Sequence, residues 1–114
     1  MLSNLGQIFD LMRNAGKIKQ NMGEMGERLA AARFIGEAGG QVKATVDGRG
    51  EMVSIKIDPA AVQAGDIEML EDLICAAIRE AVRQSRTGAQ KEMETALGGM
   101  NLGPMMDMLG GGKP

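Results

Sequence analysis

Three arginines in the second half of the chain are spaced to form a line along a helix. Arg79, Arg83 and Arg86 stand at positions i, i+4 and i+7. The nearest acid, Glu80, would lie about 80° away around a helix, so no acid is expected within the line. Like charges at these spacings slightly destabilise a helix, whereas guanidinium groups bind phosphate oxygens well. This arginine stripe is therefore either a phosphate-binding surface or a solvated helix face.

A second basic group lies near the start of the chain. Arg13, Lys17 and Lys19 fall within residues 11–19, which contain no acid. The whole sequence has 13 basic and 15 acidic residues, so a uniformly basic surface is excluded while a local one is not. There are only two phenylalanines and no Trp or Tyr, so a surface that stacks the bases of single strands is not expected.

Catalytic and metal-binding groups are scarce. The chain has no histidine, the commonest general base and metal ligand. Its one cysteine, Cys75, cannot form an internal disulfide and lies at the edge of a predicted apolar helix arc, which indicates a buried packing residue. We therefore expect no enzyme activity, no cofactor or metal, and no small-molecule substrate.

The first basic group is predicted to stand on a long helix over residues 5–32. Apolar residues there step by three and four, which makes a heptad seam. Its members are Ile8, Leu11, Ala15, Ile18, Met22, Met25, Leu29 and Ala32. Gly16, Gly23 and Gly26 each cost about 1 kcal/mol relative to alanine in a helix. The helix is therefore expected to need a partner, with its seam completing a dimer or packing on a sheet.

The stretch GGQVKATVDGRGEMVSIKIDP, residues 39–59, alternates apolar and polar residues on both sides of a glycine-rich turn. This pattern predicts a hairpin, and residues 32–38 can add a third strand to an antiparallel meander. Asp58 and Pro59 then favour a short helical turn, and Asp66 begins a second long helix that runs to about Leu97. Its apolar arc contains Leu70, Leu73, Ile74, Ala77, Ile78 and Ala81.

The fold class is thus predicted to be α+β, with residues 1–98 as a single domain. Residues 99–114 are rich in Gly and Met and are expected to be a flexible tail, with docking on a partner or on the dimer as the alternative. The first residues, MLSNLGQIFDLMRNAGK, have no apolar run of the length of a signal peptide or membrane span. We therefore expect a cytoplasmic protein without a membrane partner.

The order of these elements resembles the YbaB/EbfC family of bacterial nucleoid-associated proteins. The similar segments are Met69–Ile74, Ala76–Ala77 with Ala81, Ile57–Pro59 with the strand before it, Gly48 and the Met/Gly/Pro-rich tail, which together cover nearly the whole chain. The resemblance implies a homodimer whose paired helices project like tweezers and which binds double-stranded DNA at the nucleoid. The glycines at 16, 23 and 26 depart from the Gln/Glu/Met-rich first helix more typical of the family.

The resemblance places DNA contacts on charged positions of the two long helices: Arg13, Lys17, Lys19, Arg28, Arg79, Arg83, Arg86 and Lys91. The core and dimer contacts are expected at Leu11, Ile18, Met22, Met25, Leu29, Val53, Ile55, Ile57, Leu70, Leu73 and Ile74. Because no base-reading module is recognisable, specificity should be weak or shape-based. The alternative is a protein-interaction module of a replication or repair assembly, using the Met-rich seam and tail. Other nucleoid proteins are additional candidate partners.

Overall fold

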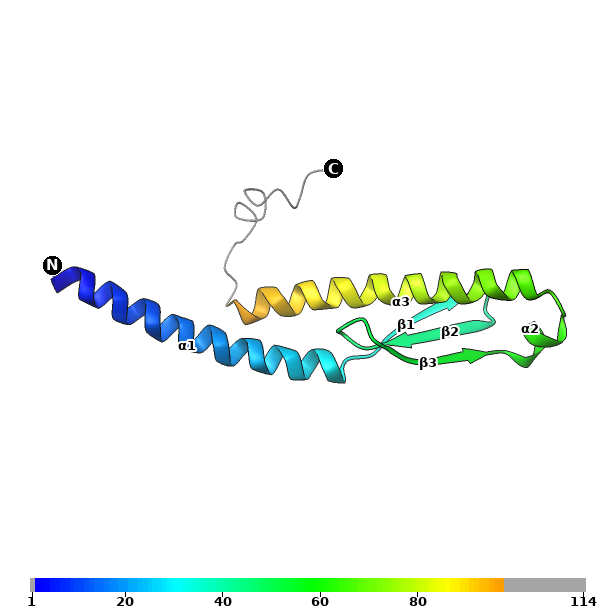
Figure 1. Ribbon diagram of the computed structural model, residues 1–114, viewed down its shortest axis with the longest axis horizontal. Coiled ribbons are helices and arrows are strands. Elements are labelled where there is room, and N and C mark those ends of the chain that lie inside the picture. Colours follow the sequence, from blue (N-terminus) through cyan, green and yellow to red (C-terminus); the bar gives the residue numbers. More distant parts are fainter. Residues whose placement is uncertain (1, 98–114) are drawn as a thin grey trace, which may run out of the picture.

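The structure, a computed structural model, describes the backbone of residues 2–97 and the side chains of residues 5–97. Its elements are α1 (Leu2–Ala31), β1 (Phe34–Ala38), β2 (Val42–Val46), β3 (Met52–Ile57), α2 (Pro59–Gln63) and α3 (Ile67–Ala96) (Figure 1). The predicted α+β class and element order are confirmed. The expectation of a flexible tail concerns residues 99–114, which lie outside the described part.

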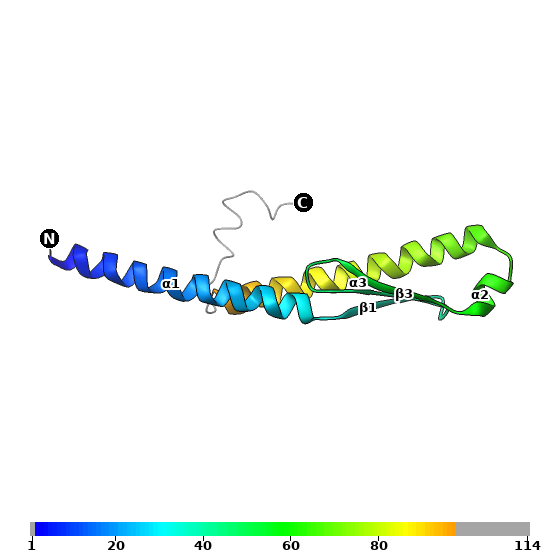
Figure 2. The same ribbon diagram turned by 60° about the horizontal axis from the view of Figure 1, so that its bottom comes forward.

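The three strands form an antiparallel meander in the order β1-β2-β3. Val42 pairs with Ile57 and Ala44 with Ile55, while a bulge between Thr45 and Val46 shifts the register at the turn. The alternate residues of β2, Val42, Ala44 and Val46, are fully buried and face α3. The long helix α3 lies along this face and packs chiefly on β1 and β2 (Figure 2). The strand β3 forms one edge of the sheet.

Small residues bring α3 unusually close to the sheet. Ala77 and Ala81 are fully buried against it. Below them lies Gly36 of β1, where an added Cβ would come 2.2 Å from the carbonyl oxygen of Ala77 and 2.4 Å from the amide nitrogen of Ala81. The two layers therefore meet backbone to backbone, which explains how a core can form with almost no aromatic side chains.

The C-terminal half of α1 packs against the end of α3. Met25 and Leu29 are buried with Ala96, and Met22 packs partly buried beside them. The Nδ2 of Asn21 donates a hydrogen bond of 3.1 Å to the carbonyl oxygen of Ala96. This half of the heptad seam therefore covers α3, which corrects the idea that the seam packs on the sheet. The N-terminal half of α1 continues past the end of α3 as a projecting arm (Figure 1).

The β2–β3 turn joins these parts. Asp47 is only 3% exposed, and its Oδ1 accepts the backbone N–H groups of Arg49 and Glu51 at 2.8 and 3.1 Å. Burial raises the pKa of the Asp47 carboxyl, but the Arg49 guanidinium and these N–H groups together bring it below its usual value. The backbone N–H of Gly48 donates to the Leu29 carbonyl, and the Ser85 hydroxyl donates to the Asp47 carbonyl, both at 2.8 Å. The turn thereby fixes where α1 ends relative to α3.

Candidate nucleic-acid interface

The arginine stripe stands on the face of α3 that points away from the sheet. The helix begins as predicted, because Oδ1 of Asp66 accepts the backbone N–H of Met69 at 3.0 Å and caps its first turn. Ala77, Ala81 and Ser85 are buried on one side of α3. Arg79, Arg83 and Arg86 are exposed on the other side. The packing of α3 on the sheet therefore presents the stripe to solvent.

The stripe is not free of acid, contrary to the expectation from helical angles. Arg83 donates to both carboxylate oxygens of Glu80, with distances of 3.0 Å from Nε and 2.6 Å from Nη2. Both side chains are long enough to close the angular gap that separates their Cα positions. Among residues 5–97, Arg79 and Arg86 have no carboxylate within ion-pair distance. These two arginines are thus free for another anion, whereas Arg83 would have to exchange Glu80 for it.

The same contact predicts a pH effect on stability. The hydrogen bonds from Arg83, and then from Gln84, lower the pKa of Glu80 from 4.5 to about 2. A carboxyl with a lowered folded-state pKa stabilises the protein above its unfolded pKa, and this stabilisation is lost as the pH falls from 4.5 toward 2. We expect urea midpoints measured between pH 7 and pH 2.5 to fall less steeply in Glu80→Gln than in the wild type. Parallel curves for the two proteins would contradict this interpretation of the pair.

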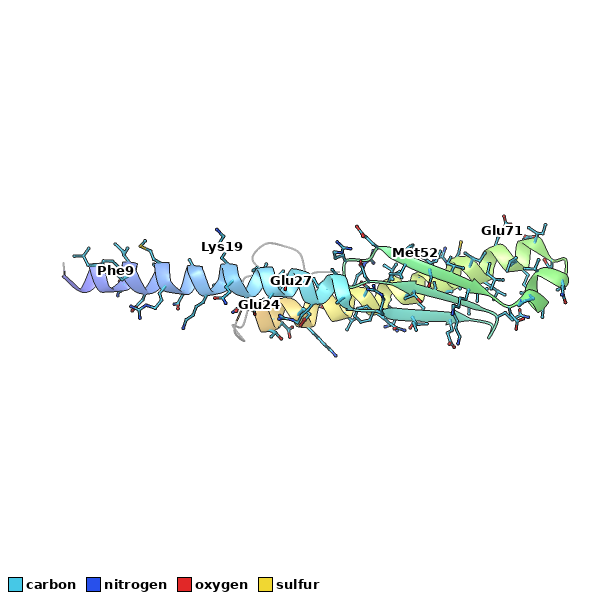
Figure 3. The ribbon with its side chains drawn as sticks, turned by 90° about the horizontal axis from the view of Figure 1, so that it is seen from below. Phe9, Lys19, Glu24, Glu27, Met52 and Glu71 are labelled. Atoms are coloured by element: carbon cyan, nitrogen blue, oxygen red, sulfur yellow. The ribbon has the colours of Figure 1, made fainter. Side chains whose placement is uncertain are left out.

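The basic residues of α1 divide into two groups. Arg13, Lys17 and Lys19 are exposed on or beside the projecting arm, and Figure 3 shows Lys19 pointing away from the rest of the molecule. Arg13 lies 3.9 Å from Asp10, a contact between two strongly exposed side chains that stabilises little. Arg28 differs, because its Nε donates to Glu92 at 2.6 Å and so links α1 to α3. Arg28 therefore has a structural role that its sequence position did not reveal.

The structure does not gather the predicted basic residues into one cluster. Because Asn21 of α1 lies level with Ala96 at the end of α3, the arm begins where α3 ends. At about 1.5 Å per helical residue, the distance along the molecule from Arg79 to Arg13 is about 40 Å. At about 3.4 Å per base pair, this corresponds to about 12 base pairs of duplex. Lys91, also exposed, lies between the two groups.

Two lysines that the sequence analysis did not select lie side by side on the open face of the sheet. Lys43 and Lys56 are direct cross-strand partners of β2 and β3, and both are exposed. Lys43 also lies 3.3 Å from Glu37. Like charges opposite each other destabilise a sheet, so stability does not explain this pair. A register counted outward from the Asp47–Gly50 turn would place Lys43 opposite Ser54, whereas the observed register, which includes the bulge between Thr45 and Val46, places it opposite Lys56, so the sequence pattern did not reveal this pair.

Some of the predicted core and dimer residues are buried in the described chain, and others are exposed. Leu70, Leu73, Ile74 and Ile57 pack partly buried against the core of the sheet, and Ile18 is half-buried on α1. Leu11 remains 68% exposed, and Val53 and Ile55 are exposed on β3. Cys75 is exposed as well, so its prediction as a buried residue is wrong. It lies one turn before Arg79, on the outward side of α3, because only a narrow strip of this helix touches the sheet.

Features of other functional classes were sought in the same part of the chain. Within residues 5–97, no group of three or more His, Cys, Asp or Glu side chains could hold a metal ion. None of the described helices is long and apolar enough to cross a membrane.

Proteins similar to this chain are known from several bacteria. A nucleoid-associated protein of Moorella thermoacetica is 49% identical over 79 residues, which cover 69% of this chain and 73% of that protein. Nucleoid-associated proteins of Anaeromyxobacter dehalogenans 2CP-C and Granulibacter bethesdensis are each 40% identical over 93 residues, or 81% of this chain and 90% and 87% of theirs.

The fold also matches a solved structure. The crystal structure of an uncharacterized protein from Helicobacter pylori superimposes with a TM-score of 0.56 at 19% identity, covering 74% of this chain and 92% of that one. At this identity the match concerns the fold alone. The resemblance seen in Ile57–Pro59 and Met69–Ile74 is confirmed, and the match extends over residues 4–100. Since the model of the YbaB/EbfC DNA-binding family matches residues 4–100, the protein belongs to this family of DNA-binding, nucleoid-associated proteins, which is not a family of enzymes.

Proposed function

We propose that this protein is a homodimer that binds double-stranded DNA at the nucleoid, in the cytoplasm, mainly through phosphate contacts and with weak or shape-based specificity. The observation that carries the proposal is the exposed line of Arg79, Arg83 and Arg86 on the outer face of α3. Two of these guanidinium groups have no carboxylate partner among residues 5–97. Two unpaired guanidinium groups on one exposed helix face, in a DNA-binding family, are best explained by phosphate as their ligand.

The shape of the helices supports contacts with the backbone of DNA instead of base reading. The buried face of α3 is held on the sheet over residues 77–85, so this helix cannot turn its end into a major groove without exposing the core. Arg79 and Arg86 instead lie side-on along a rigid helix. Since a two-fold dimer repeats each surface, every phosphate-binding arginine would be present twice. A protein with a net charge of only −2 could in this way still present a long basic track.

The edge strand β3 supports the dimer. It pairs with β2 on one side, and its other edge ends the sheet. Val53 and Ile55 are exposed on it, because α3 covers chiefly β1 and β2. An open edge with exposed apolar side chains favours pairing with another chain. A second copy that covers β3 would bury these residues and leave the outer face of α3 accessible.

The test is fluorescence anisotropy of a labelled duplex at several salt concentrations. The wild type is compared with the triple variant Arg79→Ala/Arg83→Ala/Arg86→Ala. Each phosphate contact contributes about 0.9 to the slope of log K against log salt, so losing three per protomer should flatten the slope by up to about 5 in the dimer. The matched triple lysine variant keeps the charges and should retain most of the slope.

Two results would overturn the proposal. One is the absence of duplex binding by the wild type at about 50 mM salt, where phosphate contacts are strong. The other is an unchanged slope in the alanine variant when light scattering shows the dimer intact.

A protein-interaction module remains the second candidate function, favoured by the exposed apolar residues of the arm. Leu5, Ile8, Leu11 and Met12 are all at least half exposed. If this strip binds another nucleoid or repair protein and DNA is not a ligand, the triple alanine variant should keep that interaction at full affinity. Loss of the interaction in Leu11→Ser, with no duplex binding by the wild type, would favour the module over the DNA-binding dimer.

A further inference from the structure

A groove of about 510 Å³ lies where the arm leaves α3. Leu11, Ala15 and Ile18 line it from α1, and Ala96 and Leu97 line it from the end of α3. Lys17 stands at its rim. The lining is mostly apolar, although Asn14 also contributes to it, and the Asn21–Ala96 hydrogen bond of 3.1 Å bounds the groove at its inner end. It therefore continues the packed part of the heptad seam onto the arm.

The seam residues beyond the groove are uncovered in the described chain. Leu5 and Ile8 are about half exposed, and Leu11 more so. We call Leu5, Ile8, Leu11, Ala15 and Ile18 the arm strip. Figure 3 shows the arm lying beyond the end of α3, with Phe9 also turned outward. An amphipathic helix normally buries such a strip, and nothing in the described part of the chain covers this one.

We infer that residues 98–114 of the same chain cover the arm strip. The first argument is covalent: Ala96 and Leu97 form one wall of the groove, so residue 98 begins at its mouth. The second argument is composition: the segment carries the large apolar residues Met100, Leu102, Met105, Met106, Met108 and Leu109. Methionine adapts to shallow, irregular apolar surfaces.

The length of the segment agrees with this placement. Twelve residues from Leu97 to Leu109 can extend over about 40 Å, while the arm strip from Ile18 to Leu5 is about 20 Å long. Because the segment is tethered at the groove, its effective concentration is on the order of millimolar, so even a weak contact is formed.

The covered arm would also be stiffer. Gly16 lies in the arm, where an added Cβ would meet nothing within 4 Å, and glycine favours a helix less than alanine does. Burial of Leu11 and Ile18 under the segment offsets this lower helix propensity. The C-terminal segment therefore acts as an intramolecular support for the projecting half of α1.

The test uses a nitroxide label on the full chain. Cys75→Ala removes the exposed native cysteine, and Gly110→Cys carries the label next to the apolar residues without replacing one of them. We expect the label to broaden the amide NMR signals of residues 5–18 on its own chain. Leu102→Ser/Met105→Ser/Met106→Ser should abolish the broadening. Asn101→Ser/Lys113→Ser, which keeps every apolar residue of the segment, should leave it unchanged.

A mixed sample distinguishes the other occupants. Isotope-labelled chains without nitroxide are mixed with unlabelled chains that carry it. Broadening of residues 5–18 in this mixture, at the strength seen within one chain, would show that the segment covers a second copy and would overturn the proposal. Absence of broadening in both samples would overturn it too, leaving the strip to a different protein. Broadening within one chain alone supports it, whether or not the protein binds DNA.

Discussion

Gly36→Ala is expected to lower the free energy of unfolding by about 3 kcal/mol, because overpacking at a backbone contact cannot be relieved by rotating a side chain. The added methyl group would come 2.2 Å from the Ala77 carbonyl oxygen and 2.4 Å from the Ala81 amide nitrogen. Both atoms belong to the backbone of α3, so the helix would have to move away from the sheet. That movement opens the contact that keeps Ala77 and Ala81 fully buried.

The same substitution in α1 provides the control. Gly26 lies in a helix, and an added Cβ would meet nothing within 4 Å. Gly26→Ala should therefore raise the free energy of unfolding by up to about 1 kcal/mol, through helix propensity. Urea denaturation followed by circular dichroism measures both variants, at one fixed protein concentration because dimerisation would add to the apparent stability. Equal stabilities for Gly36→Ala and Gly26→Ala would refute the close contact between α3 and β1.

Local signals explain why most of the fold could be predicted from the sequence. The alternation over residues 42–57 and the glycine-rich turn specify the hairpin, and Asp58 and Asp66 cap the helices that follow them. Each of these signals depends only on residues that are close together in the sequence. The close contact between Gly36 and α3 could not be predicted in this way. Gly36 lies on β1, and the residue that it contacts, Ala77, follows 41 residues later in the sequence.

The sequence predicted which basic residues belong to the candidate site, but not which of them are already paired with a carboxylate. Helical spacing correctly put Arg79 and Arg86 on an exposed face. It could not show that Arg28 is bound to Glu92, which lies 64 residues away, or that Arg83 reaches Glu80. Helical spacing also could not show where the heptad seam of α1 changes from packed to exposed, because that point depends on where α3 ends. Side-chain reach and tertiary overlap, both absent from a periodic pattern, account for these differences.

Ile55→Lys is expected to separate the proposed dimer into monomers. Ile55 lies on β3 and is 37% exposed in one chain, so a lysine can reach solvent there without disturbing the folded protomer. In a two-fold dimer the substitution occurs twice. If each copy removes a central contact worth about 2 kcal/mol, the dissociation constant rises by about 1,000-fold. Sedimentation velocity at micromolar protein should then show a monomer.

Ser54→Lys is the matched control, because its side chain lies on the opposite, polar face of the same strand and adds the same charge. It should leave the dimer intact. A dimer presents twice as many arginines as a protomer, so Ile55→Lys should also roughly halve the salt slope of duplex binding, while Ser54→Lys should not reduce it. Monomeric wild type, or identical behaviour of the two lysine variants, would remove β3 from the dimer contact. Loss of the dimer with an undiminished salt slope would instead show that a single protomer supplies all the phosphate contacts.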